Sequence, residues 1–192
     1  MLYVLLTYPM ASFTLFDTAI GRCGLIWTDR GLAGVQLPED DAAALLARIG
    51  RRWPGAEPAA PPAEVLAAIR EITALLAGER RDLGGIALDL EGVPPFHGRV
   101  YQVARTILPG ATLTYGDIAA RLGDPGSARA VGQALGQNPW PLVVPCHRVL
   151  GAGGRMGGFS AVGGAELKRR LLLIEGAPLA AERSLFDEAP GA

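Results

Sequence analysis

Cysteine and histidine, the side chains best suited to nucleophilic and acid–base chemistry near neutral pH, are rare in this chain. The 192 residues contain two of each, and one of each pair is adjacent in the run PLVVPCHRVLG, as Cys146 and His147. Pro145 fixes the entry to the cysteine, His147 offers a base, and Arg148 adds a positive charge that favours a thiolate. We therefore interpret this run as a candidate site with Cys146 as the nucleophile.

The histidine needs help to reach the sulfur. Neighbouring residues point to opposite sides of a strand and stand about 100° apart on a helix, so a bridging water is the expected proton route from Cys146 to His147. A base also needs a group that orients it. Glu175 is the candidate, at the end of the predicted helix GAELKRRLLLIEG. A last-turn carboxylate is disfavoured by the helix dipole, which hints at another role.

The first half of the chain predicts a small antiparallel sheet with helices. Glycine and aspartate separate short apolar runs, and later segments carry apolar residues at three- and four-residue steps. A further alternating run ends at Gly92-Val93-Pro94-Pro95, which we interpret as a domain boundary. The predicted strands are residues 2–6, 12–18, 23–28, 31–37 and 86–90, and the predicted helices are residues 42–49 and 61–79.

The second half predicts helices with short connections, at residues 94–108, 114–123 and 127–138. The last two have the lengths and the turn chemistry of a helix–turn–helix, with Thr114 as N-cap and Asp117 as its capping-box acid. The glycine-dense run 151–158 fits no nucleotide-binding fingerprint and predicts a close-approach loop. The expected division is residues 1–92, residues 93–178 and a loosely held tail at 179–192.

Charge is unevenly distributed along the chain. The net charge is −1, but residues 95–178 carry nine basic and four acidic side chains, which leaves −6 on the remainder. A basic patch on the second half could hold phosphates. Charge alone is better explained by arginines that replace lysines on a solvated surface, since Lys168 is the only lysine.

Composition excludes several classes. Two cysteines cannot form a four-thiolate zinc site, so we expect no metal, no cofactor and reduced thiols, with Cys23 a buried strand residue. The apolar opening lacks a basic leader, and no run reaches the roughly 18 apolar residues of a spanning helix. The expectation is a cytoplasmic protein that is neither secreted nor membrane-bound.

Four motifs together resemble the O6-alkylguanine-DNA alkyltransferases, also called methylated-DNA–protein-cysteine methyltransferases. They are TYGDIAARLGDPGSARAVGQALGQNP, PLVVPCHRV, GGFS and the helix end LLLIEG, within residues 96–176. The first half resembles the family's accessory domain in length and in strand–helix order. The resemblance implies an α+β fold with a ribonuclease-H-like first domain and a helical, winged-helix-like second domain that carries the helix–turn–helix.

The resemblance also implies a reaction. The protein would act as a monomer on double-stranded DNA and transfer the alkyl group of O6-alkylguanine, with O4-alkylthymine as a further candidate, to Cys146. The base would first be flipped out of the duplex by a minor-groove helix–turn–helix. A thioether is a poor leaving group, so each molecule would act once.

The roles that the resemblance assigns fall into two groups. For the chemistry, His147 is the water-mediated base, Glu175 holds the imidazole and Asn138 holds the turn behind Cys146. For the base, Tyr115 lines the pocket and aids rotation, and Arg129 replaces the flipped base in the stack. The remaining contacts are the small recognition-helix residues Ala128, Ala130 and Gly132, the Ser160 N–H on the guanine oxygen, the Val149 carbonyl on the exocyclic amine, and the pocket wall Phe159.

Two departures from the family pattern concern the pocket rim. Phe159 stands where many relatives have tyrosine, and the AVGG that follows Ser160 is longer by two residues. Three other readings compete. A lesion-binding alkyltransferase-like module would lack the acceptor cysteine, a helix–turn–helix regulator would leave PCHRV unused, and a thiol hydrolase would need better geometry than adjacent Cys and His provide.

Overall fold

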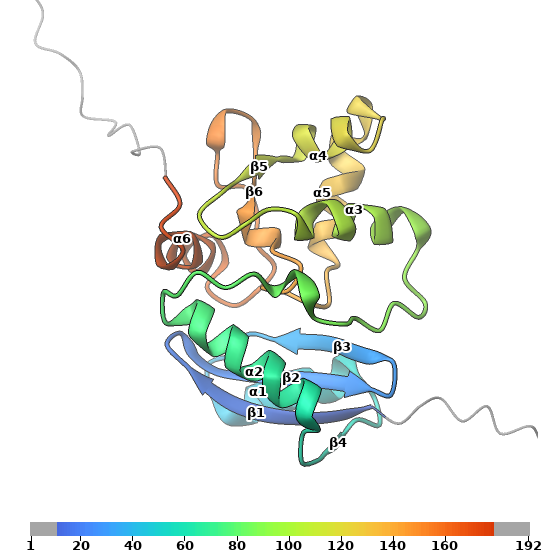
Figure 1. The fold of residues 1–192 in the computed structure, drawn as a ribbon, viewed down its shortest axis with the longest axis vertical. Coiled ribbons are helices and arrows are strands. Elements are labelled where there is room, and N and C mark those ends of the chain that lie inside the picture. The colour runs from blue at the N-terminus through green and yellow to red at the C-terminus, as the bar shows by residue number, and fades with distance from the viewer. Residues whose placement is uncertain (1–10, 179–192) are drawn as a thin grey trace, which may run out of the picture.

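The computed structural model describes residues 11–178, which form two halves (Figure 1). The strand expected at residues 2–6 and the expected tail at 179–192 lie outside the described residues. One half holds a small sheet flanked by helices, and the other is mainly helical. The protein is thus an α+β structure, as the sequence predicted. No helix of the described part is long and apolar enough to cross a membrane.

The sheet has four strands in the order β3-β2-β1-β4. β1 (Ser12–Thr18), β2 (Gly21–Thr28) and β3 (Gly31–Gln36) form two antiparallel hairpins. Gly31 closes the second hairpin with a φ of 137°, a conformation that favours glycine. β4 (Glu57–Pro58), which was not predicted, pairs with β1 in parallel, so the expected antiparallel sheet also has one short parallel edge strand.

Helices cover both faces of this sheet. α1 (Ala42–Arg52), capped by the Asp41 carboxylate, packs through Leu45 and Ile49 on Ile26. α2 (Ala63–Leu76) packs on the other face. Both faces of the sheet offer side chains to a helix because successive side chains of a strand point to opposite faces. Cys23 on β2 is fully buried, as predicted, and burial raises the pKa of its thiol to about 11.

The strand predicted at residues 86–90 does not form. The segment follows a 3-10 turn (η1, Leu83–Gly85) and makes a single bridge, between Leu88 and Leu32. The alternation of apolar and polar residues does not follow burial here. Asp89 is buried and accepts hydrogen bonds from Thr28 and Arg30, whereas the apolar Leu90 is exposed.

The other half begins with α3 (Pro95–Arg105), and two short helices follow. The Thr114 hydroxyl accepts from the Asp117 N–H and the Asp117 carboxylate accepts from the Thr114 N–H, which confirms the predicted capping box. The remaining elements are β5 (Leu113–Thr114), α4 (Tyr115–Arg121), η2 (Pro125–Ser127), α5 (Ala128–Gly136), η3 (Cys146–Arg148), β6 (Val149–Leu150), η4 (Ala152–Gly154) and α6 (Gly164–Ile174).

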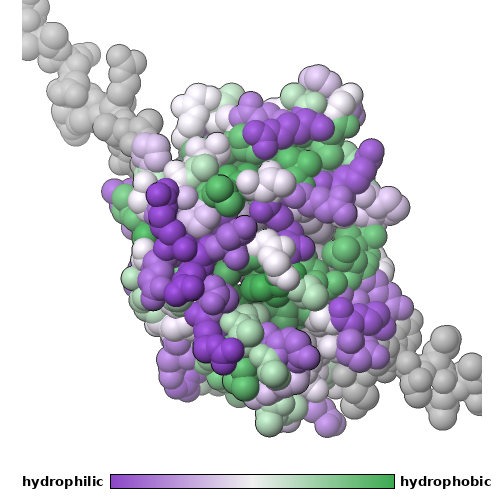
Figure 2. Space-filling model, viewed as in Figure 1, coloured by the Kyte–Doolittle hydropathy of each residue, from purple (hydrophilic) through white to green (hydrophobic). Residues whose placement is uncertain are grey.

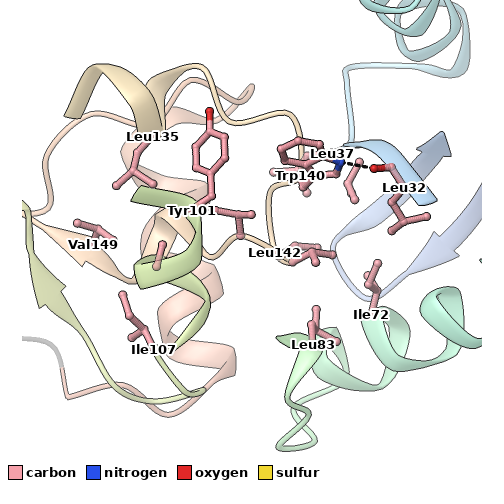
Figure 3. Packing of buried hydrophobic residues seen from close by; sticks show 14 of the residues in the cluster. Leu32, Leu37, Ile72, Leu83, Tyr101, Ile107, Leu135, Trp140, Leu142 and Val149 are labelled. Atoms are coloured by element: carbon pink, nitrogen blue, oxygen red, sulfur yellow. Dashed lines mark hydrogen bonds between the residues drawn. The ribbon is translucent and has the colours of Figure 1, made fainter. Parts of the chain in front are cut away.

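One hydrophobic core runs through both halves. Trp140 and Leu142 lie between side chains of the sheet half and side chains of the helical half (Figure 3). The Trp140 indole N–H donates to the Leu32 carbonyl at 2.6 Å, and the Val35 N–H donates to the Pro139 carbonyl at 2.9 Å. The face shown in Figure 2 mixes hydrophilic and hydrophobic residues. The division at residue 92 therefore stays a prediction.

Candidate functional site

Cys146 opens the 3-10 turn η3, directly after Pro145. The Cys146 N–H donates to the Val144 carbonyl at 2.8 Å, and the Arg148 N–H donates to the Pro145 carbonyl at 2.9 Å. These bonds hold the half-buried cysteine at the wall of a cavity of about 410 Å3. The cavity is lined by Tyr115, Gly132, Leu135, Gly136, Cys146, Gly158, Phe159 and Ser160.

Asn138 supports the segment that leads to the cysteine. Its side chain is buried, and Nδ2 donates to the Val144 carbonyl at 2.8 Å while Oδ1 accepts from the Trp140 N–H at 2.9 Å. Both ends of the amide are therefore used, which fixes its orientation. The Asn138 side chain thus ties together the backbone of the segment that leads into the cysteine turn.

His147 is fully buried and pairs with Glu175, with 2.9 Å between Nε2 and Oε1. Burial alone would raise the pKa of Glu175, but the hydrogen bonds and charges of His147 and Arg148 outweigh it and lower the pKa to about 2. An ionised carboxylate only accepts, so Nε2 carries the imidazole proton. Nδ1 then holds the free lone pair, and it has no hydrogen-bond partner within residues 11–178.

The pKa of the His147 imidazole lies below its ordinary value. Burial has the largest effect, and it outweighs the opposite influence of the Glu175 carboxylate. The ring is therefore neutral at pH 7, as a general base must be. This arrangement can accept one proton at Nδ1 while Glu175 steadies the ring.

Arg148 does not do what its position in the sequence suggested. Its Nε and Nη2 donate to the two oxygens of Glu175, each at 2.8 Å, and its Nη1 donates to the Ile107 carbonyl. The guanidinium is thus held behind the site, as the ion partner of Glu175. The expectation that Arg148 supplies the positive charge at the sulfur was wrong.

Lys168, on α6, supplies that charge instead. Its side chain is fully buried, and Nζ donates to the Val149 carbonyl at 2.6 Å and lies 5.9 Å from the centre of the Tyr115 ring. Burial lowers the pKa of Lys168 to about 8, against the opposite effect of the Cys146 thiolate.

The pKa of the Cys146 thiol reflects the same neighbours. Burial raises it, whereas the Asn138 side chain, the Lys168 charge and the nearby backbone N–H groups lower it. Burial prevails, so the thiol is protonated at rest. A base is therefore required before the sulfur can act as a nucleophile.

A sequence signal for Lys168 did exist. Lys168, Leu171, Leu172 and Glu175 follow steps of three and four residues along α6, and all four are buried. A charged residue at such a spacing lies on the core side of its helix. Two charges on one buried face are a strong indication of a site.

The other predicted residues fall into two places. Tyr115, Gly132, Phe159 and Ser160 line the cavity with Cys146. Burial raises the pKa of the Tyr115 hydroxyl, so it stays protonated and can donate. Outside the cavity lining are Arg129, which is exposed on α5, the half-buried Ala128 and Ala130, and Val149, whose carbonyl is bound by Lys168.

The glycine-dense run after the cysteine comes close to the tyrosine. Gly157 has a φ of 67°, and a β-carbon there would lie 3.4 Å from the Tyr115 hydroxyl oxygen. A larger residue would be strained and would crowd the cavity rim. This agrees with the close-approach loop predicted for residues 151–158. Within residues 11–178, no three His, Cys, Asp or Glu side chains gather as metal ligands.

Comparison with known proteins gives consistent matches. The family described as 6-O-methylguanine DNA methyltransferase, DNA binding domain, matches residues 95–177. The methylated-DNA–protein-cysteine methyltransferase of Mycobacterium tuberculosis is 43% identical over 126 residues, which cover 66% of this chain and 74% of the relative. That of Methanothermobacter thermautotrophicus is 36% identical over 156 residues, which cover 81% of this chain and 80% of the relative.

Solved structures match as well. The crystal structure of Mycobacterium tuberculosis OGT in complex with DNA is 35% identical, with a TM-score of 0.70, over 87% of this chain and 95% of that one. The O6-methylguanine methyltransferase of the same organism is 36% identical, with a TM-score of 0.69, over 93% of this chain and 100% of that one.

Proposed function

The chain belongs to the methylated-DNA–protein-cysteine methyltransferase family, and from this premise we propose that Cys146 accepts the alkyl group of an O6-alkylguanine in DNA. The reaction is DNA repair by direct, stoichiometric transfer. The observation that carries the assignment is the position of Cys146, at the wall of a cavity shared with Tyr115 and in front of the His147–Glu175 pair.

The guanine must leave the duplex to reach this cavity, at a cost of a few kcal/mol. We assign the wedge that fills the gap to Arg129, because it is exposed on α5 next to Ala128 and Ala130. Those small side chains, with Gly132, leave room for a DNA backbone against the helix. A minor-groove approach of α5 is part of the proposal, and the DNA complex of the mycobacterial relative supports a DNA partner.

Proton removal precedes bond formation. The thiol proton of Cys146 passes through a bridging water to Nδ1 of His147, since Nε2 is held by Glu175. The Lys168 ammonium then favours the thiolate that remains. A buried thiol is thus activated only by its immediate neighbours.

The sulfur then displaces the guanine oxygen. The bond between Sγ and the alkyl carbon forms, the bond between that carbon and O6 breaks, and its electron pair stays on the guanine. The Ser160 N–H and the Tyr115 hydroxyl donate to O6 as charge develops there. The proton lost by the thiol is returned to the guanine, so the products are a thioether and an unmodified base.

The exocyclic amine of the guanine is assigned to two carbonyls, those of Cys146 and Val149. The Val149 oxygen already accepts from Lys168, but a carbonyl has a second lone pair. The Cys146 oxygen likewise accepts from the Val149 N–H. Because a thioether does not leave again, the protein acts once and needs no cofactor.

Finer features of the expected architecture belong to the same proposal. They are a ribonuclease-H-like sheet half, supported by the helices on both faces of the sheet, and a winged-helix-like half, supported by α4 and α5. The proposal also includes the domain division at residue 92, a monomeric state and a cytoplasmic location. It further includes O4-alkylthymine as a second substrate. A lesion-binding module without transfer is disfavoured because Cys146 is present.

Intact-protein mass spectrometry tests the assignment. Incubation with a duplex that contains O6-methylguanine should add one methylene unit to the protein, once per molecule and on the Cys146 peptide. The Cys146→Ser variant should bind the same duplex and gain nothing. A mass gain elsewhere, or tight lesion binding by the wild-type protein without any gain, would refute the assignment.

A further inference from the structure

A second, smaller cavity lies behind the cysteine, at the seam between the two halves. Its volume is about 40 Å3, and Cys146, Phe159 and Ser160 line it as well as the larger cavity. Gln36 from the end of β3 and Arg48 from α1 also line it. The sheet half therefore contributes side chains to the surroundings of the nucleophile.

Gln36 brings an unused acceptor to this cavity. The residue is only 5% exposed, and its Nε2 donates to the Leu37 carbonyl and to the Glu39 carboxylate, each at 3.0 Å. These acceptors fix the orientation of the amide. Its Oε1 has no hydrogen-bond partner within residues 11–178.

Arg48 brings an unused donor. Its Nε is buried and also lacks a hydrogen-bond partner in the described part of the chain. The nearest carboxylate oxygen in an ion pair with it, Oε1 of Glu39, lies 3.9 Å away, too far for a hydrogen bond. One donor and one acceptor without partners thus belong to residues that line a space next to the sulfur.

We propose that this cavity, which we call the hydroxyl subsite, receives the terminal hydroxyl of a 2-hydroxyethyl group on O6 of guanine. The proposal rests on the proposed function, because the alkyl carbon must already be placed against Cys146. A hydroxyl is the small group that both donates and accepts. It donates to Oε1 of Gln36 and accepts from Nε of Arg48.

Hydrogen-bond matching argues against other alkyl termini. The volume of about 40 Å3 admits a small polar terminus, since about 10–15 Å3 of such space suffices for one water molecule. A carboxylate would pair with Arg48 and Arg52, which both line the cavity, but it has no proton to donate to the Gln36 oxygen. A methyl terminus would displace water and leave both polar atoms without a partner, which is unfavourable.

The chemistry of transfer is unchanged by this subsite. The bond between Sγ and the first carbon forms and the bond from that carbon to O6 breaks, while the hydroxyl keeps its proton. Gln36 and Arg48 are therefore specificity-determining residues and not catalytic ones. Their effect should appear in the choice between alkyl groups of equal length.

Single-turnover rates with three matched duplexes test the proposal. The lesions are O6-methylguanine, O6-(2-hydroxyethyl)guanine and O6-propylguanine, and the last two differ only in a hydroxyl against a methyl terminus. The wild-type protein should react about three- to tenfold faster with hydroxyethyl than with propyl, the range expected for one or two hydrogen bonds. Arg48→Met and Gln36→Met should each bring that ratio close to one.

Arg51→Met is the matched control, because Arg51 is an exposed neighbour on α1 that does not line the subsite. It should keep the wild-type ratio and the wild-type rate on O6-methylguanine. A wild-type ratio of one or less overturns the proposal, as does an unchanged ratio in folded Arg48→Met. Absence of reaction with O6-methylguanine in the wild type would instead overturn the proposed function.

Discussion

The buried ammonium of Lys168 donates to the carbonyl of Val149 at 2.6 Å, three residues beyond the nucleophile. This bond fixes the cation where its charge lowers the pKa of the Cys146 thiol. A lysine whose own pKa falls to about 8 in the folded chain is held there against the cost of burial. The chain's only lysine therefore lies beside the cysteine that we propose as the acceptor.

Replacing Lys168 by methionine should reduce the reactivity of Cys146 at pH 7 by about tenfold or more, because loss of a neighbouring cation lowers the thiolate fraction. The rate of reaction with O6-benzylguanine across a pH series measures this. The rate should fall, and the pH at which the rate rises should move to a higher value. Arg169→Met, at an exposed position on the same helix, should leave the profile in place.

Replacing Glu175 by glutamine should slow alkylation, because the imidazole of His147 loses its ionised partner. It should also lower the free energy of unfolding by about 3 to 5 kcal/mol, since Arg148 keeps a buried charge without a counterion. Urea unfolding and single-turnover rates check the two effects separately. Adding Arg148→Met to Glu175→Gln should restore part of the stability but not the rate, and restoration of both would contradict the orienting role.

Replacing Arg129 by alanine should slow repair of a lesion in duplex DNA by about tenfold or more, because the flipped base leaves a gap that costs a few kcal/mol. Reaction with free O6-benzylguanine requires no flipping and should be nearly unchanged. Comparing the two rates in one preparation is the measurement. Equal losses with both substrates would contradict the wedge role.

Stability should fall on acidification in two steps. The folded state holds His147 neutral, so below its ordinary pKa of about 6.5 the unfolded chain binds a proton that the folded chain does not. Glu175 has a pKa of about 2, below its ordinary 4.5, so its contribution is present above about 4.5 and is lost as pH falls toward 2. Urea unfolding between about pH 7.5 and 2 should show the first loss before the second. Constant stability down to pH 5 would contradict a buried neutral imidazole.

Sequence reasoning identified the elements whose pattern is local. The hairpins, the capping box at Thr114 and the pairing of His147 with Glu175 follow from turn residues, helix periodicity and scarce residue types. The false strand at residues 86–90 shows where this fails. An alternating pattern assumes that the apolar side chains are the buried ones, but here Asp89, in its ion pair with Arg30, is buried and Leu90 is exposed.

The electrostatics of the site were harder to predict. Arg148 is close to Cys146 in sequence but forms an ion pair with Glu175. Lys168 is 22 positions from Cys146, and its charge lowers the pKa of the Cys146 thiol. The direction of a side chain on a 3-10 turn depends on what packs behind it. The contribution of Gln36 and Arg48 to the surroundings of Cys146 likewise depends on how the two halves pack, which no local pattern encodes.

The short parallel pair of β5 and β6 has a kinetic consequence. It joins Leu113 to Val149 and Thr114 to Leu150, so the start of α4 and the end of the cysteine turn share one backbone ladder. Tyr115 and Cys146 thus lie next to the two strands of one short ladder, which ties their backbone segments together. The slow motion of a repair event should accordingly belong to the rotating nucleotide, and the protein should meet it already in its reactive shape.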